Sequence, residues 1–166
     1  GNISDTCGNN EKSSVVLLLD RISDPHNVGA ILRSAEVFGA QAVIGTQRHS
    51  APETGALAKS ASGTLERQPY LRVNNLSRSI EELKSLGFVV LGLDGLAEKT
   101  INEGINSFPI GPMAFILGAE GPGLRDKTKL YCDMLVKVPS FHGEGSLNVS
   151  NAAIIALYDI RHGKRL

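Results

Sequence analysis

Long apolar stretches and closely spaced cysteines are both missing from this sequence, and their absence excludes two classes of protein. No apolar run approaches the roughly 20 residues that a membrane-spanning helix needs, so we expect no membrane partner. The two cysteines, Cys7 and Cys132, lie far apart and match no zinc-binding spacing. Such sparse use of cysteine suggests a reducing compartment, and we expect a cytoplasmic protein.

An excess of charge of one sign is lacking as well. Lys and Arg together number 17 and so do Asp and Glu, which makes the formal net charge zero. Because domains that bind nucleic acid on their own usually carry a basic excess, a nucleic-acid partner would have to be held by a local patch or by another domain. We also expect no metal ion, because no ligand-like spacing relates the histidines to one another or to the cysteines. The four histidines are His26, His49, His142 and His162.

What the sequence does contain is a regular alternation of apolar runs and helical patterns over 166 residues, enough for one domain with a sizeable core. Apolar runs predict strands at residues 15–20, 41–45, 70–73, 88–93, 113–118 and 134–138. Helical spacing predicts helices at residues 27–39, 52–60 and 77–87 and from near Asn148 onward. This alternation predicts an α/β domain over residues 15–166, with a mostly parallel sheet flanked by helices. The polar residues 1–14 predict a loose tail or the remnant of a linker.

Three polar segments follow predicted strands, and they are the main indication of function. They are residues 20–33, 118–123 and 139–152. In open parallel sheets, ligands bind beyond the carboxyl ends of the strands. We therefore expect the three segments to meet at one edge of the sheet.

The first segment contains "DPHNVGAILR". Pro25 disfavours a helical conformation for Asp24, and Asn27 can cap the helix that follows. The apolar side of this helix carries Val28, Leu32, Ala35 and Phe38. Arg33 lies on the other side, so it is either a solvated surface arginine or a ligand for an anion such as phosphate. Both interpretations stay open.

The second segment, "FILGAEGPG" at residues 115–123, has its glycines in the order G-x-x-G-x-G with Glu120 inside. This is not the dinucleotide fingerprint G-x-G-x-x-G, and no Gly-Lys-Ser/Thr follows to make a P-loop. The glycines at 118, 121 and 123 permit positive φ angles or close approach of the backbone to a ligand. A backbone cradle with one working carboxylate is favoured over a glycine-rich turn with a solvated glutamate.

The third segment contains "GEGSLNVSNAA". Ser146 and Asn148 are good helix caps, and capping is the simplest role for each. Leu147 between them is unusual for a surface loop and suggests an apolar wall for a ring-shaped ligand. The helix that follows carries its apolar stripe on Val149, Ala153, Ala156 and Ile160.

Together the three segments resemble the SpoU (TrmH-like) family of SPOUT RNA 2′-O-ribose methyltransferases, from residue 16 to about residue 161. The family motif N-x-G-x-x-x-R matches Asn27, Gly29 and Arg33. The motif L-G-x-E-x-x-G-L matches Leu117, Gly118, Glu120, Gly123 and Leu124. The motif that runs from an Ile/Val-Pro step to S-L-N-V matches Val138, Pro139, Ser146, Leu147, Asn148 and Val149. One departure is His142, where the family often has glycine.

The resemblance implies a C-terminal trefoil knot that forms a pocket for S-adenosylmethionine, and a homodimer with its active site near the subunit seam. Cofactor-binding residues implied by the motifs are Leu117, Gly118, Val138, Pro139 and Leu147. Catalytic residues implied by the motifs are Asn27, Arg33, Glu120, Ser146 and Asn148. Arg33 would stabilise the 2′-oxygen or contact the adjacent phosphate, and Glu120 would take the proton or position Arg33. The transfer needs no metal.

The substrate implied by the resemblance is RNA, with a guanosine of 23S ribosomal RNA favoured over transfer RNA. Many family members carry an RNA-binding domain before the catalytic one, and the zero net charge agrees with such a domain outside this chain. A knotted RNA-binding module without catalysis is the main alternative. A doubly wound enzyme that binds NAD or ATP is disfavoured, because the phosphate-binding motifs are missing.

Overall fold

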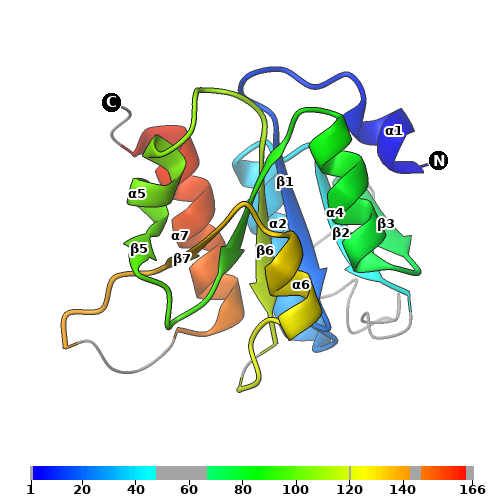
Figure 1. Ribbon diagram of the computed structural model, residues 1–166. Helices are drawn as coiled ribbons and strands as arrows, with labels where there is room; N and C mark the ends of the chain where they lie inside the picture. Colours follow the sequence, from blue (N-terminus) through cyan, green and yellow to red (C-terminus); the bar gives the residue numbers. More distant parts are fainter. Residues whose placement is uncertain (1, 48–66, 120, 143–146, 164–166) are drawn as a thin grey trace.

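A seven-stranded sheet runs through the part of the chain that the computed structural model describes, residues 2–47, 67–119, 121–142 and 147–163 (Figure 1). Its strands are β1 (Val15–Asp20), β2 (Ala42–Thr46), β3 (Tyr70–Val73), β4 (Val89–Leu93), β5 (Lys99–Thr100), β6 (Met113–Gly118) and β7 (Met134–Lys137). Their order is β3-β2-β1-β6-β4-β7-β5, and every neighbouring pair is parallel. The predicted α/β fold with a mostly parallel sheet is confirmed.

The side chains of β1 explain why helices cover both faces of this sheet. Val15, Leu17 and Leu19 belong to one hydrophobic cluster, whereas Val16 and Leu18 belong to another. Successive side chains of a strand point to opposite faces, so a strand that is apolar throughout must be covered on both sides.

Six helices within the described residues supply that cover. They are α1 (Asn2–Cys7), α2 (Pro25–Val37), α4 (Leu76–Ser85), α5 (Ile101–Asn106), α6 (Asp126–Tyr131) and α7 (Val149–His162). Helices α2, α5 and α7 pack on the face of the first cluster, and α1, α4 and α6 lie on the opposite face (Figure 1). The apolar stripe predicted for α7 is confirmed, since Val149, Ala153 and Ala156 are buried and Ile160 packs against the same cluster.

All six predicted strands are confirmed, with bounds within one residue of those observed. The helix predicted at residues 52–60 lies outside the described residues. Sequence patterns missed β5, α5 and α6, because elements of two to six residues are too short to show a period. A signal for α5 was present, however. Thr100 and Glu103 form a capping box, in which each side chain accepts a hydrogen bond from the other residue's backbone N–H.

Residues 1–14 differ in part from the loose tail that their polarity predicts. They include α1, in which Ile3 and Cys7 are buried and join the cluster that α4 also lines. Two apolar residues four positions apart lie on the same side of a helix, and this spacing docks α1 on the domain. The division at residue 14 into a linker and a catalytic domain stays a prediction.

The strand order creates a switch point between β1 and β6. From β1 the chain moves outward through β2 and β3, then crosses to β4 on the other side of β6. At such a reversal the connections leave in opposite directions and open a crevice beyond the carboxyl ends of the strands. The trefoil knot expected for the C-terminal segment stays a prediction, since residues 143–146 lie outside the described residues.

The described residues contain neither a membrane-spanning helix nor a cluster of metal-ligating side chains. None of their helices combines the length and the apolar character that crossing a membrane requires. In the same part of the chain, no three His, Cys, Asp or Glu side chains gather closely enough to hold a metal ion.

Candidate active site

A cavity of about 190 Å³ lies at the switch point, beyond the carboxyl ends of β1 and β6. Its lining joins residues that follow β1, a residue that follows β6 and the first residue of α7. It includes Arg21, Ser23, Asp24, Asn27, Ala119 and Val149. The three polar segments that the sequence singled out therefore each contribute to one cavity, as expected from a parallel sheet.

The start of α2 corrects the prediction that Asn27 caps this helix. The N-cap residue is Asp24, whose extended backbone is followed by Pro25 in the first turn and whose Oδ1 accepts a hydrogen bond from the N–H of His26 at 2.9 Å. Proline suits the first turn because its missing N–H has no partner to lose there. The helix thus begins two residues before Asn27, which leaves the Asn27 side chain available for another contact.

That contact joins the first polar segment to the third. The Asn148 side chain donates a hydrogen bond from Nδ2 to Oδ1 of Asn27 at 3.1 Å. The Oδ1 atom of Asn148 accepts from the N–H of Ser150 at 2.9 Å, so Asn148 is the N-cap residue of α7, as predicted. Because the cap fixes which atom of the amide faces the helix, it also directs the Nδ2 group toward Asn27.

The second segment forms a tight turn that has no space for a side chain at Gly118. A Cβ atom at this position would lie 2.3 Å from the carbonyl carbon of Gly123. The N–H of Gly123 donates to the carbonyl oxygen of Ala119 at 2.8 Å, and Gly121 and Gly123 both have positive φ angles. The turn therefore depends on glycine, as the sequence predicts. Glu120 lies outside the described residues.

A buried carboxylate that sequence reasoning missed holds this turn against β1. Asp20, the last residue of β1, has a fully buried side chain. Its Oδ2 accepts from the backbone N–H of Arg125 at 3.0 Å, and its Oδ1 accepts from Nε of Arg125 at 2.8 Å. The sequence does contain a signal for this contact, namely an acidic residue at the end of an otherwise apolar strand. A carboxylate that is buried there needs a hydrogen-bonding or charged partner.

Arg33 is placed differently from the other predicted catalytic residues. It is exposed on α2, on the side away from the core, and it does not line the cavity. Arg33 lies six positions after Asn27, which places it about 9 Å further along the helix and roughly 120° around it. The fold therefore brings Asn27 and Asn148 together but leaves Arg33 outside this cavity. Ser146 lies outside the described residues.

Four of the predicted cofactor residues lie at the ends of β6 and β7, and the fifth, Leu147, lies just before α7. Strands β6 and β7 both pair with β4, so their ends are two strand spacings apart, about 10 Å. The side chain of Leu117 is buried in the core, so only its backbone can reach a ligand. Gly118 and Val138 are half-buried, and Pro139 is exposed. Leu147 is 46% exposed, which is compatible with an apolar wall for a ring.

Neither thiol is a candidate nucleophile. Burial raises the pKa of Cys7 to about 11, and the charge of Glu82 adds to the effect. The pKa of Cys132 is raised to about 12, again mainly by burial. Both side chains are free thiols, and neither lines a cavity described here.

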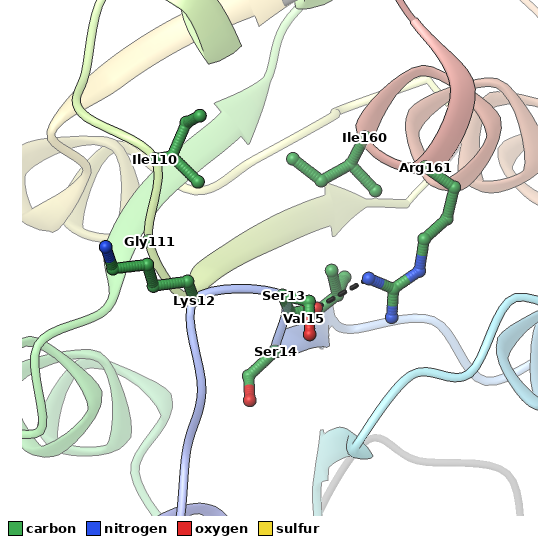
Figure 2. A pocket seen from close by; sticks show the side chains of 8 residues that line it. All are labelled: Lys12, Ser13, Ser14, Val15, Ile110, Gly111, Ile160 and Arg161. Atoms are coloured by element: carbon green, nitrogen blue, oxygen red, sulfur yellow. Dashed lines mark hydrogen bonds between the residues drawn. The ribbon is translucent and has the colours of Figure 1, made fainter.

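A larger cavity, of about 280 Å³, lies at the opposite edge of the sheet (Figure 2). Lys12, Val15, Ile110 and Arg161 are among the residues that line it. The guanidinium of Arg161 donates to three backbone carbonyl oxygens, those of Ser13 at 2.5 Å, Phe38 at 2.7 Å and Gly39 at 3.0 Å. These hydrogen bonds connect α7 to two other segments of the chain, which indicates a structural role for Arg161. The larger of the two cavities is therefore not identified as the functional one by its size alone.

Comparisons with known proteins agree with the motifs. A model of the SpoU rRNA Methylase family matches residues 14–158. An uncharacterised tRNA/rRNA methyltransferase of Synechocystis is 39% identical over 160 residues, which are 96% of this chain and 41% of that protein. The 23S rRNA (guanosine-2′-O-)-methyltransferase RlmB of Pseudomonas putida is 42% identical over 149 residues, 90% of this chain and 59% of that protein.

A solved structure is similar over the same region. The crystal structure of the SpoU methyltransferase AviRb from Streptomyces viridochromogenes, in complex with the cofactor AdoMet, matches with a TM-score of 0.80 and 28% identity. The match covers 94% of this chain and 59% of that one. The chain therefore spans less than two thirds of these relatives.

Proposed function

The chain belongs to the SpoU rRNA Methylase family, and from this premise we propose that it transfers a methyl group from S-adenosylmethionine to a ribose 2′-hydroxyl of RNA. The observation that carries the proposal is the cavity at the switch point, where the three polar segments meet and Asn148 donates a hydrogen bond to Asn27. A related methyltransferase binds AdoMet, and relatives at about 40% identity act on ribose 2′-oxygens of 23S ribosomal RNA.

The residues at the ends of β6 and β7 suit S-adenosylmethionine. Gly118, the last residue of β6, is half-buried and has no side chain over its backbone, while Val138 and the partly exposed Leu147 offer apolar surface on the segments that lead to α7. A backbone edge can hydrogen-bond an adenine or an amino-acid group, and apolar walls suit a ring. When bound, the cofactor supplies an electrophilic methyl group on a sulfonium.

The protein's part in the reaction is to orient the 2′-hydroxyl and to stabilise the charge that develops on its oxygen. We assign the charge stabilisation to Arg33, whose guanidinium stays protonated and cannot itself take the proton. Asn27 and Asn148 would fix the geometry near the ribose. Glu120 would accept the proton from the 2′-hydroxyl or position Arg33, and Ser146 would complete the hydrogen bonds. Both residues lie outside the described part of the chain.

We further propose a homodimer in which α2 and α7 lie at the subunit seam. The two helices contact each other, and their outer surface carries the exposed apolar residues Val37, Ile154 and Tyr158. Apolar groups of this kind on adjacent helices favour association. Because Arg33 lies outside its own chain's cavity, a second copy is a natural source of the arginine. Light scattering at micromolar concentration tests this proposal, and a monomer would contradict it.

For the substrate we propose a guanosine of 23S ribosomal RNA, because that is the activity in the names of several relatives. The net charge of zero, together with the greater length of those relatives, supports further RNA-binding surface outside these 166 residues. Free thiols and a ribosomal RNA substrate together support a cytoplasmic location.

Two measurements test the proposal. Isothermal titration calorimetry of the longest natural form of the protein should detect S-adenosylmethionine, and no binding at millimolar cofactor would favour a non-catalytic module. Tritiated methyl groups should then be transferred from the cofactor to unmodified 23S ribosomal RNA, and nuclease digestion should map the label to a 2′-O-methylguanosine. Label on unmodified transfer RNA alone would contradict the substrate but not the reaction.

A further inference from the structure

The residue after β1 has an unusual backbone. Arg21 has a φ of +63°, and it is the only residue other than glycine with a positive φ in the described parts of the chain. A side chain makes this left-handed conformation unfavourable, and it persists only where the surrounding structure imposes it. An arginine in a position that suits glycine therefore calls for an explanation.

The constraint comes from the neighbouring residue. Both carboxylate oxygens of Asp20 accept hydrogen bonds from Arg125, and the Asp20 side chain is fully buried. Asp20 also pairs with Gly118 across the sheet. The end of β1 is thus held on two sides, and we attribute the conformation of Arg21 to this anchorage.

In this position Arg21 places a positively charged side chain at the cavity at the switch point. Arg21 is exposed and lines this cavity beside Ser23 and Asn27. Among the described residues it forms no hydrogen bond or ion pair, in contrast to Arg125 and Arg161. The cavity's other charged residue, Asp24, uses its Oδ1 to accept from the N–H of His26.

We propose that Arg21 binds a phosphodiester group of the RNA substrate in this cavity, next to the ribose that Asn27 and Asn148 orient. A guanidinium offers a planar fork of donors that matches two phosphate oxygens. Phosphate contacts position an RNA without reading its sequence, so the role of Arg21 is to set the register of the target ribose. This inference rests on the proposed RNA methyltransferase function.

The test uses variants that separate the charge from the backbone. Arg21→Gly removes the guanidinium and relaxes the backbone, so its melting temperature should stay within about 3 °C of the parent. Arg21→Lys keeps a positive charge and the strained backbone. Lys12→Ala is the matched control, because Lys12 is an exposed cation before β1, at the opposite edge and about 20 Å away along a six-residue strand.

Binding to unmodified 23S ribosomal RNA is measured at several salt concentrations with the longest natural form of the protein. Arg21→Gly should weaken binding on the order of tenfold, the scale of one charge-assisted hydrogen-bonded contact. It should also lower the slope of log K against log salt by about 0.7 to 0.9, the loss of one phosphate contact. Arg21→Lys should restore most of the slope, and Lys12→Ala should match the parent.

Three results would overturn the inference. They are binding by Arg21→Gly within twofold of the parent, an unchanged salt slope with altered RNA sequence preference, and an equal loss in Lys12→Ala. Methyl transfer is measured separately on the parent. If the parent binds RNA through Arg21 but transfers no methyl group, the proposed function fails while the phosphate contact stands.

Discussion

The two edges of the sheet each carry a cavity with an arginine, but the two arginines have different surroundings. At the amino edge, Arg161 donates to the carbonyl oxygens of three residues in two other segments of the chain. At the carboxyl edge, Arg21 lines a smaller cavity and makes no such contacts with described residues. Helix α7 borders both cavities, with Val149 at one end and Arg161 at the other.

This difference shows that cavity size and residue type are weaker guides to function than the use of the polar atoms. A guanidinium that donates from each of its three nitrogens to a backbone carbonyl stabilises the fold, because buried carbonyl groups need hydrogen-bond partners. A guanidinium that faces solvent at a switch point remains able to bind an anion. We therefore expect substitution of Arg161 at the amino edge to change stability, and substitution of Arg21 or Asn148 at the carboxyl edge to change RNA binding or methyl transfer.

The largest effect is expected for Arg33→Ala. Loss of the group that stabilises charge on the 2′-oxygen should lower methyl transfer by roughly 100-fold or more. Cofactor affinity should stay within a few-fold, and the melting temperature should hardly change because Arg33 is exposed. Single-turnover transfer assays with calorimetry and a thermal melt measure all three. Transfer within a few-fold of the parent would remove Arg33 from this role.

Arg161→Met should lower stability and leave methyl transfer unchanged, the reverse of what is expected for Arg33→Ala. Three hydrogen bonds from a charged donor are lost, at a cost of about 2 kcal/mol, which lowers the melting temperature by roughly 4 to 8 °C. Transfer per folded molecule at 25 °C should match the parent. Lys12→Ala in the same cavity serves as control and should leave the melting temperature unchanged. Wild-type stability in Arg161→Met would contradict a structural role for this arginine.

A smaller effect separates the two roles of Asn148. In Asn148→Ala both the cap and the bond to Asn27 are lost, so stability should fall by about 1 kcal/mol. Asn148→Asp keeps an oxygen that accepts from the Ser150 N–H but loses the Nδ2 donor. Both variants should lose transfer by about tenfold, whereas only the alanine variant should be less stable. Full transfer by Asn148→Asp would show that the cap alone matters.

The smallest effect is expected for thiol reagents, because neither Cys7 nor Cys132 lines the cavity at either edge of the sheet. Burial raises the pKa of Cys7 to about 11 and that of Cys132 to about 12, so both thiols stay protonated until the pH rises far above neutrality. At pH 8 only about a thousandth of Cys7 is thiolate. Iodoacetamide should label neither in the native protein and both in guanidinium chloride, as mass spectrometry can measure. Rapid labelling of either native thiol would contradict this.

Much of the fold could be predicted because its signals are local. The run from Val15 to Leu19 is apolar without interruption, and this alone indicates a strand buried on both faces. The sequence pattern predicts the start of α2 two residues late, because Asn27 and Asp24 are both good caps and only the position of Pro25 in the first turn favours Asp24. Short elements such as α6 have too few residues to show a period.

The candidate site divides in the same way. The sequence by itself determined which segments carry the unusual chemistry, since the glycines at 118, 121 and 123 and the asparagines at 27 and 148 can be identified from the sequence alone. Only the tertiary structure decided that Asn148 meets Asn27, that Asp20 holds Arg125 and that Arg161 is used for stability. The physical reason is that hydrogen-bond partners more than 100 residues apart depend on strand order. Strand order is a property of the packed sheet and leaves no periodic trace along the chain.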